Sequence, residues 1–264
     1  MARAAHPALK LLWAALALAL LAYAGACALM YSQQRALMYF PQGTRLDAIH
    51  TDFQLDRGDA VLRGWVLNPG REDALLYFGG NAEAVEGMRT RLRAWFPDRT
   101  VYLLAYRGYG ASDGAPEEAL LFDDALALFD HAKAAHGEGR IAVVGRSLGS
   151  GVASYVAGQR PVDRLVLVTP FDSLVAVAQG HYPWLPAHWL LKDRYESDRH
   201  LAGYAGPLLV VRAGRDRVVP PANTDRLIDG LPKAPQVLVL PEASHDSVFN
   251  DDDAADAITR FLRD

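Results

Sequence analysis

The sequence has a single cysteine, Cys27, in 264 residues. One cysteine cannot form an internal disulfide or a Cys-based zinc site, so disulfide scaffolds and zinc frameworks are excluded. Lysine is scarce too: four of the 27 basic residues are lysine, and the basic residues are dispersed rather than clustered on one face. With a formal charge of −4, the chain has no general attraction for polyanions. We therefore expect no nucleic-acid partner, and no motif indicates a metal or a cofactor.

Charge is absent from a long stretch near the N-terminus. Leu11 to Tyr31 is 21 residues without a charged side chain. At about 1.5 Å per residue, a helix of this length matches the roughly 30 Å hydrocarbon core of a bilayer. The stretch has no polar face, which disfavours a buried core helix. We predict that residues 1–34 are a single-pass membrane anchor and that residues 35–264 form one catalytic domain.

Two other interpretations of the apolar stretch stay open. A cleaved signal peptide is one, because Ala22, Ala24 and Ala26 are small enough for a peptidase site, although the run exceeds the usual length of roughly 7 to 15 residues. A lipoprotein signal is the other, because the residues before Cys27 resemble a bacterial lipoprotein site, with Ala where Leu is usual.

The basic residues on either side of the stretch bear on its orientation. Arg3 and Lys10 precede it, and Arg35 and Arg45 follow it, which gives a slight bias toward a cytoplasmic N-terminus. We therefore expect the catalytic domain on the non-cytoplasmic, periplasmic side of the membrane.

From residue 40 onward, short apolar runs alternate with helical patterns. Strands are predicted at residues 51–55, 61–67, 74–78, 101–105, 141–144, 165–168, 208–211 and 237–240. Helices are predicted at residues 84–96, 116–136, 152–159, 222–231 and 247–262. The first two strands should form an antiparallel edge. The later alternation predicts an α/β fold, with a mostly parallel central sheet and helices on both faces.

Residues 170–206 interrupt this alternation. The segment is too long for a simple connection and carries Tyr182, Trp184, Trp189, Tyr195 and Tyr204. We predict a small lid inserted after a strand, at about residues 171–205. Such aromatic residues either pack within the protein or cover a substrate, and the sequence leaves both open.

Residues 145–149 read Gly-Arg-Ser-Leu-Gly, between a β-branched run and a helical pattern. A Gly-x-Ser-x-Gly motif between a strand and a helix is typical of a nucleophile elbow. The glycines give a strained turn room, so the serine Oγ stays exposed above the sheet. The alternative is a plain glycine-rich turn. Ser147 is therefore our candidate nucleophile.

A serine nucleophile needs a base, and the base needs an acid that holds its tautomer. Asp216 follows the strand at residues 208–211, and His245 follows the next strand, at residues 237–240. Each residue alone has an ordinary alternative, an N-cap for the aspartate and a solvated loop for the histidine. Asp172, after the strand at residues 165–168, is the rival acid. The remaining histidines considered lie on a helix or in the lid: His131, His136, His181, His188 and His200.

The oxyanion of an acyl-transfer reaction needs two hydrogen-bond donors. The backbone N–H of Leu148 is the first candidate, because it opens a helix whose first N–H groups lack partners. The second donor should come from the loop after Phe78, where Gly80 or Asn81 is the candidate.

Four motifs together resemble the membrane-anchored α/β-hydrolases of the bud-emergence type: residues 78–83, residues 107–110, residues 145–149 and residues 170–174. The resemblance runs from about Tyr39 to the C-terminus. It implies an α/β-hydrolase fold related to serine aminopeptidase-type and depalmitoylase-type hydrolases, with a triad of Ser147, Asp216 and His245. The group often has His-Gly-Asn after its third strand. This chain has Gly79-Gly80-Asn81 instead, so a histidine side chain can play no role there.

The predicted function is that of a membrane-anchored serine hydrolase. It would cleave an acyl ester, thioester or amide through an acyl-enzyme on Ser147, so the expected partners are an acylated substrate and the bilayer. An acyltransferase would use the same residues and differ only in what resolves the acyl-enzyme. A non-catalytic, membrane-tethered binding protein is the second alternative, and the complete triad argues against it. No sequence motif indicates the identity of the substrate or the oligomeric state.

Overall fold

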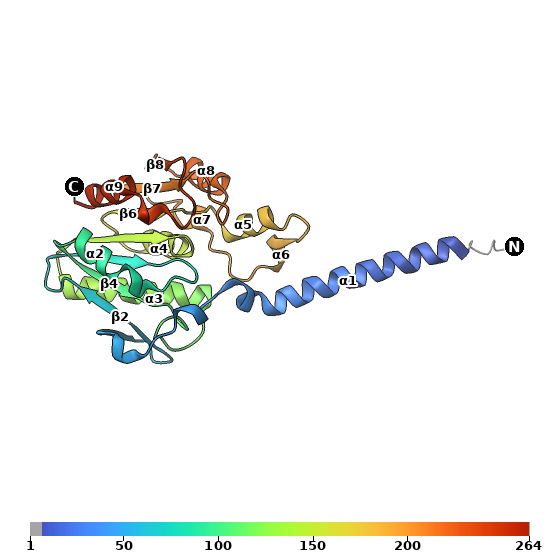
Figure 1. Cartoon of the computed structure of the whole chain (residues 1–264), viewed down its shortest axis with the longest axis horizontal. Helices are drawn as coiled ribbons and strands as arrows, with labels where there is room; N and C mark the ends of the chain where they lie inside the picture. Colours follow the sequence, from blue (N-terminus) through green and yellow to red (C-terminus); the bar gives the residue numbers. More distant parts are fainter. Residues whose placement is uncertain (1–6, 264) are drawn as a thin grey trace.

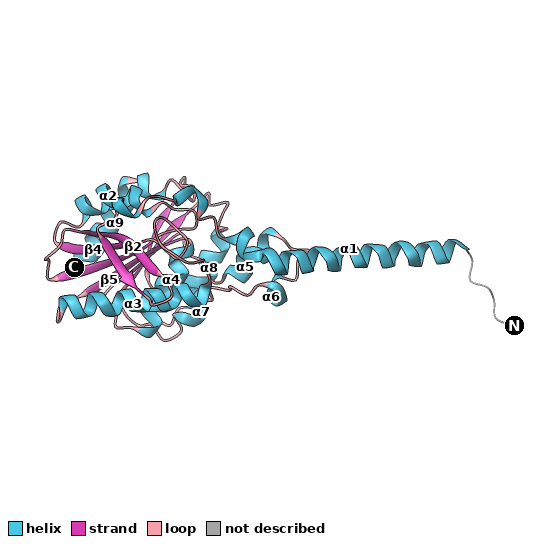
Figure 2. Cartoon of the chain, turned by 90° about the horizontal axis from the view of Figure 1, so that it is seen from below, coloured by secondary structure: helices cyan, strands magenta, loops and turns pink. Residues whose placement is uncertain are grey.

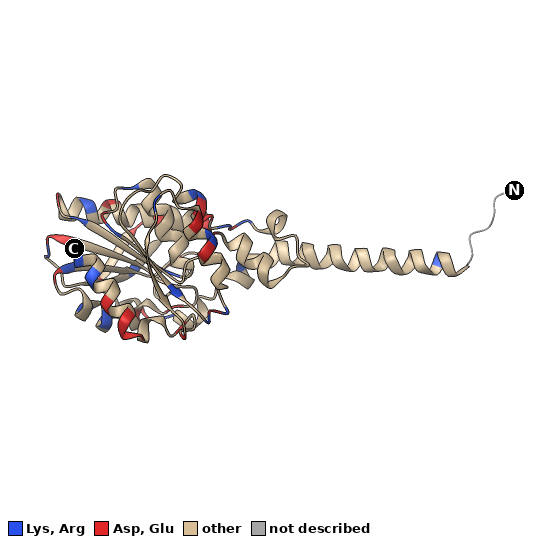
Figure 3. Cartoon of the chain, turned by 90° about the horizontal axis from the view of Figure 1, so that it is seen from above, with Lys and Arg blue, Asp and Glu red and all other residues tan. Residues whose placement is uncertain are grey.

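The computed structural model describes residues 7–263, in which one long helix projects from a rounded α/β body (Figure 1). The helix, α1, runs from Pro7 to Met38. It is long and apolar enough to cross a membrane, and its only charged residues are Lys10 and Arg35 (Figure 3). Arg3, one of the basic residues that favour a cytoplasmic N-terminus, lies outside the described residues. The helix continues without a break through the domain boundary predicted at residue 34.

The body is built on one eight-stranded sheet. In chain order, its strands are β1 (Phe53–Asp56), β2 (Val61–Leu67), β3 (Asp73–Phe78), β4 (Arg99–Leu104), β5 (Ile141–Arg146), β6 (Leu165–Val168), β7 (Leu208–Ala213) and β8 (Gln236–Leu240). They lie side by side in the order β1-β2-β4-β3-β5-β6-β7-β8. Strand β2 pairs antiparallel with both of its neighbours, and all other pairs are parallel. Every predicted strand is present, with its ends shifted by at most two residues, and the antiparallel edge is confirmed.

Helices cover both faces of the sheet (Figure 2). Helices α2 (Arg89–Trp95) and α9 (Asp252–Arg263) pack on one face. Helices α3 (Glu118–His136), α4 (Leu148–Gln159), α7 (Ser197–His200) and α8 (Pro221–Gly230) form the layer on the other face. The central strands β3 to β7 are therefore buried on both sides, which explains their nearly continuous apolar sequences.

Two predicted helices are each divided into a 3₁₀ turn and a shorter α-helix. Residues 84–96 divide into a 3₁₀ turn, Val85–Met88, and helix α2, because the Gly87 N–H bonds to Ala84 O. Residues 247–262 divide into a second 3₁₀ turn, Val248–Asn250, and helix α9. The Asp251 carboxylate caps the second piece, since its Oδ1 accepts the Asp253 N–H at 3.0 Å.

The predicted lid forms two distinct parts. Helices α5 (Leu174–His181) and α6 (Ala187–Leu190) lie beside the end of α1, as Figure 1 shows. The later part, including α7, packs on α4. The aromatic residues divide in the same way: Trp184 and Trp189 are exposed, whereas Tyr195 is completely buried.

A polar clamp joins the end of α1 to the lid. The buried Asp193 carboxylate receives two hydrogen bonds from the Arg35 guanidinium, each 3.1 Å long, and a third of 2.9 Å from the Tyr39 hydroxyl. Gln34 adds a pair of bonds to the lid backbone, donating to Leu190 O at 3.1 Å and accepting the Lys192 N–H at 2.7 Å. A buried carboxylate with a bidentate arginine partner is held strongly, so the end of α1 and the lid form one unit.

Candidate active site

The predicted nucleophile lies on a strained turn between β5 and α4. Ser147 has φ 50° and ψ −119°, a left-handed conformation that costs a non-glycine residue about 1–3 kcal/mol. Its backbone is fixed on both sides: its N–H donates to Val168 O at 2.9 Å, and its carbonyl accepts the Ser150 N–H at 2.8 Å. The neighbouring chain leaves no room for larger residues, because a Cβ on Gly145 would overlap Gly149 O and a Cβ on Gly149 would overlap Phe78 O. The motif is therefore a tightly packed elbow rather than a loose turn.

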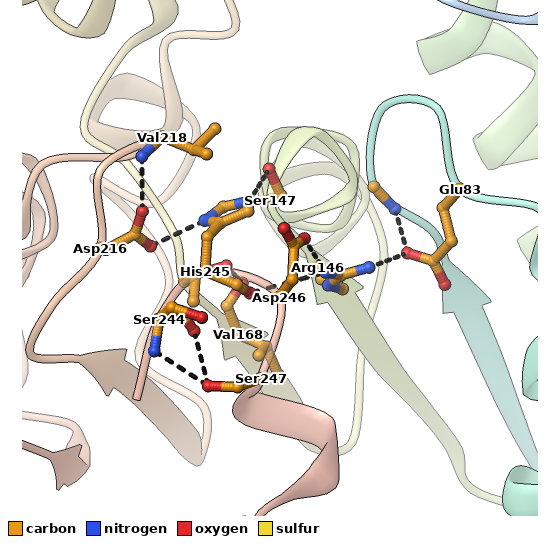
Figure 4. A network of polar contacts seen from close by, with 12 residues as sticks. Glu83, Arg146, Ser147, Val168, Asp216, Val218, Ser244, His245, Asp246 and Ser247 are labelled. Atoms are coloured by element: carbon orange, nitrogen blue, oxygen red, sulfur yellow. Dashed lines mark hydrogen bonds and ion pairs between the residues drawn. The ribbon is translucent and has the colours of Figure 1, made fainter. Parts of the chain in front are cut away.

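The structure brings the three predicted triad residues together (Figure 4). His245 Nε2 lies 2.9 Å from Ser147 Oγ, and His245 Nδ1 lies 2.7 Å from Asp216 Oδ2. The second carboxylate oxygen, Asp216 Oδ1, accepts the N–H groups of Val218 at 2.9 Å and Val219 at 2.8 Å. All three triad side chains are buried. This geometry lets the histidine take the serine proton while the aspartate fixes the histidine tautomer.

The rival acid, Asp172, makes no hydrogen bond to this histidine and is bonded elsewhere. Its Oδ1 accepts a hydrogen bond of 2.8 Å from Asn223, and its Oδ2 accepts one of 2.7 Å from Arg226. Both oxygens therefore have partners on helix α8. Within residues 7–263, Asp216 is the carboxylate that contacts His245.

The other histidines serve different contacts. His136 bonds to Tyr102, and His188 bonds to Arg194. His200 packs edge-on against the stacked rings of Phe122 and Tyr155, with centroid distances of 5.3 and 5.0 Å. His131 packs near the Phe53 ring, and His181 bonds to Val218 O at 2.9 Å. Within the described part of the chain, Ser147 Oγ has no histidine partner except His245.

The structure separates the two candidates for the second oxyanion donor. The Gly80 N–H donates to Glu83 Oε2 at 2.7 Å, so Gly80 is already occupied. The N–H groups of Asn81 and Leu148 make no hydrogen bond within residues 7–263. Both residues line the cavity beside Ser147. We therefore retain Leu148 and Asn81 as the candidate pair, and the N-terminus of α4 adds its positive dipole end to the same spot.

The Asn81 side chain fixes this donor loop to the end of α1. Its Nδ2 donates to Met38 O at 2.5 Å, while its Oδ1 accepts the Tyr109 hydroxyl at 2.7 Å and the Phe40 N–H at 3.2 Å. The amide thus uses both of its ends inside the protein. Its role is to hold the backbone in place, which leaves the Asn81 N–H free to face a substrate.

An ion-pair network lies beside the triad residues and contains residues for which the sequence predicted no role. Arg146 Nη1 contacts Glu83 Oε2, and Arg146 Nη2 contacts Asp246 Oδ1, each at 2.9 Å (Figure 4). Glu83 also accepts the Tyr77 hydroxyl at 2.6 Å. The network joins the donor loop, the elbow and the His245 loop. Arg146 lies inside the elbow motif and Glu83 ends the first motif of the resemblance, so the sequence contained a signal for both.

Burial sets the protonation of this network. It raises the pKa of Tyr77 well above its usual value, and the Glu83 carboxylate raises it further, so the phenol keeps its proton and donates it. Burial is the largest single influence and works to lower the pKa of Arg146, but its neighbours Glu83, Tyr77 and Asp246 together more than offset burial, and the net shift is upward. The guanidinium therefore stays charged at any pH the protein meets.

A cavity of about 290 Å³ lies above Ser147. Most of its lining is hydrocarbon and comes from the lid: Phe171, Leu174, Val177, Ala178, His181, Tyr182, Leu185, Ala187, Leu190 and Leu191. Helix α1 adds Met30, Gln34, Leu37 and Met38, and the loop after Asp216 adds Val218 and Val219. Apolar pockets with a few polar groups at one end are typical of small-molecule sites. The α1 residues are a second group that sequence reasoning missed, because an apolar helix gives no sign of which face meets a pocket.

Comparisons with known proteins agree with this architecture. Residues 73–203 match the family model described as alpha/beta hydrolase fold. An uncharacterised protein of Mycobacterium tuberculosis is 34% identical over 262 residues, which cover 93% of each chain. The lysophosphatidylserine lipase ABHD12 of Xenopus tropicalis is 30% identical over 167 residues, which cover 55% of this chain and 43% of that one.

Solved structures show the same fold. The Pyrococcus furiosus esterase Pf2001 superimposes with a TM-score of 0.65 at 18% identity, over 80% of this chain and 91% of that one. The esterase Est1E of Butyrivibrio proteoclasticus, solved with ferulic acid bound, gives a TM-score of 0.65 at 13% identity, over 81% of this chain and all of the other.

Proposed function

This chain belongs to the α/β-hydrolase family and is a hydrolase, and we propose that it is a membrane-anchored serine hydrolase acting on acyl esters through Ser147, His245 and Asp216. The observation that carries the proposal is the unbroken chain of two hydrogen bonds from Ser147 Oγ through His245 to Asp216, at 2.9 and 2.7 Å. Such a chain turns a poorly nucleophilic hydroxyl into an attacking group. The relatives named as esterases and a lipase favour an ester over an amide.

The reaction follows from the geometry in two steps. First, Ser147 Oγ attacks the acyl carbon while its proton moves to His245 Nε2, and the oxyanion accepts the N–H groups of Leu148 and Asn81. The alcohol then leaves with the proton from His245, and an acyl-serine remains. Water repeats the sequence, since His245 takes its proton and the acid leaves as Ser147 recovers its hydrogen. Thioesters could enter the same path, and an acyltransferase would differ only in the final acceptor.

Replacement of the nucleophile tests the proposal. We expect Ser147→Ala to lose hydrolysis of p-nitrophenyl esters by about 10⁴ to 10⁶ in rate, with the fold retained. Ser154→Ala is the matched control: Ser154 is also buried in α4, and its hydroxyl bonds to Ser150 O, away from the triad. Substantial turnover by Ser147→Ala would reject the assignment.

We also propose that α1 is an uncleaved anchor with the catalytic domain on the periplasmic side. The support is the length and apolar composition of α1 and its clamp to the lid through Arg35 and Asp193. The full-length chain should therefore remain in the membrane after alkaline washing, and protease added outside spheroplasts should digest its catalytic domain. Recovery of a mature chain lacking about the first 26 residues would instead support the signal-peptide interpretation, for which the apolar length is unusual.

A further inference from the structure

One face of α1 forms a wall of the active-site cavity. Met30, Gln34, Leu37 and Met38 line the cavity, and their spacing of three and four residues places them on one side of the helix. Leu29, one position earlier, is 63% exposed and does not line the cavity. The helix that would anchor the protein is therefore also part of the binding pocket.

The lid extends along the part of α1 that is suited to the bilayer. The Tyr23 hydroxyl donates to Trp184 O at 2.9 Å, and the Lys192 ammonium lies 4.2 Å from the centre of the Tyr31 ring. Tyr23 lies eight residues before the end of the charge-free stretch, which is about 12 Å along a helix. If that stretch fills the hydrocarbon core, the Trp184 end of the lid lies below the headgroups.

The exposed side chains of the lid are of the kinds expected just below the lipid headgroups. Trp184 is 55% exposed, Trp189 is 82% exposed and Tyr182 is 49% exposed. Tryptophan and tyrosine concentrate at membrane interfaces, because their rings are apolar and carry one polar group. Elements lying in the interface reach roughly 5–10 Å into it, which is comparable with the depth derived from Tyr23. Lys192, near the level of Tyr31, can keep its charge among the headgroups.

The rim of the cavity is also apolar and partly exposed. Among its lining residues, Leu37, Tyr182 and Val218 are about half exposed. The opening is therefore bordered by apolar groups from α1, the lid and the loop after Asp216. An apolar rim of this kind attracts lipid and repels a charged, water-soluble substrate.

We propose that the cavity opens toward the bilayer, between α1 and the lid, and that it takes the acyl chain of a membrane lipid directly from the leaflet. The volume of about 290 Å³ lies just below the usual range of roughly 300–1,000 Å³ for ligand pockets. The substrate class is therefore a lipid ester with one acyl chain in the pocket, its carbonyl at Ser147 and its headgroup at the membrane surface. In this arrangement the α1 wall, including Met30 and Leu37, contacts the acyl chain. This proposal rests on the serine-hydrolase and anchor assignments above.

The first test concerns the α1 wall. Full-length protein in phosphatidylcholine vesicles is assayed with p-nitrophenyl esters from butyrate to palmitate. Met30→Trp fills part of the cavity, so the ratio of kcat/KM for palmitate to kcat/KM for butyrate should fall about tenfold or more, since each methylene in an apolar pocket is worth about tenfold or more. Leu29→Trp is the matched control and should keep the wild-type profile. Equal profiles for the two variants would overturn the role of α1.

The second test concerns the entry route. In vesicles containing monooleoylglycerol, Trp184→Ser together with Trp189→Ser should slow hydrolysis of that lipid about tenfold or more while leaving soluble p-nitrophenyl butyrate unchanged. Ile49→Ser, an 81% exposed apolar residue outside the lid and α1, is the control. An NBD dye on Trp189→Cys in a Cys27→Ala background should shift to the blue when vesicles are added, whereas the dye on Ile49→Cys should not.

Three results would count against the proposal in different ways. An equal loss of hydrolysis of both substrates in the double variant would mean that Trp184 and Trp189 support the fold. An unshifted dye at position 189 would place the lid in water. Either result overturns the entry route, while butyrate hydrolysis by the wild-type protein still supports the triad. If wild-type protein hydrolyses neither ester faster than Ser147→Ala, the proposed function fails, and the entry route fails with it.

Discussion

Asp216→Asn is the change for which the hydrogen bonds predict the consequence most directly. Asp216 Oδ1 accepts two backbone N–H groups, from Val218 and Val219. An asparagine must keep its carbonyl oxygen there, because its NH₂ group would meet two donors. The NH₂ group then faces His245 Nδ1 in place of the oxygen that now lies 2.7 Å away.

This reversal changes the histidine tautomer. Nδ1 must become the acceptor, so the imidazole proton moves to Nε2, which lies 2.9 Å from Ser147 Oγ. A protonated Nε2 cannot take the proton of Ser147. We expect kcat to fall by about 10⁴, which equals about 5.5 kcal/mol of transition-state stabilisation. Initial rates of p-nitrophenyl ester hydrolysis near neutral pH measure this loss, and circular dichroism checks the fold.

Asp172→Asn is the matched control. Its carboxylate bonds to Asn223 and Arg226, and the Arg226 side chain is 51% exposed. The ion pair is therefore largely screened and is worth about 1 kcal/mol or less. Hydrolysis should be nearly unchanged, and stability should fall slightly. A severe loss in Asp172→Asn with a mild one in Asp216→Asn would refute the reasoning and place the acid after β6.

Three further predictions follow from the packing. Gly149→Ala should destabilise the protein by about 1–3 kcal/mol or more, measured by urea unfolding, because its Cβ would overlap Phe78 O, whereas Gly180→Ala meets no atom within 4 Å and should be tolerated. Glu83→Gln should lower kcat about 10- to 100-fold with a smaller effect on KM, since it weakens charged hydrogen bonds to Gly80 and Arg146 that hold the donor loop; an unchanged kcat would contradict this role. Burial lowers the pKa of His200, so the unfolded chain binds that proton more readily and stability should fall as pH drops below about 6.5, by at most about 1.4 kcal/mol per pH unit. Melting temperatures between pH 5 and 8 should show a flatter acid side in His200→Gln, and parallel curves would contradict the assignment.

The sequence predicted the sheet well, and it picked out the residues of the candidate site, because the signals of both are local. A buried parallel strand such as Val143-Val144 reads as a β-branched run, and the turn after it requires glycines that are visible at Gly145 and Gly149. The juxtaposition of Ser147, Asp216 and His245 could be anticipated because each follows a strand, and the carboxyl ends of parallel strands meet at one edge of the sheet.

Features that depend on tertiary packing were beyond the sequence. Gly80 and Asn81 were equivalent donor candidates until the Gly80 N–H proved to be bonded to Glu83. The apolar stretch ending near Tyr31 predicted a spanning helix, but no pattern within it predicts that Met30 faces the cavity. That information lies in the docking of α1 on the lid through Arg35 and Asp193, which are far apart in the chain.

The central claim is that Ser147 is the nucleophile, and covalent labelling tests it most directly. A fluorophosphonate reacts with a serine only when a neighbouring base activates it. Mass spectrometry of the labelled, digested full-length protein should find one adduct, on the peptide containing Ser147. The adduct should be absent in Ser147→Ala and strongly reduced in His245→Gln. An active protein that is labelled on another residue, or that hydrolyses esters without labelling at Ser147, would contradict the account.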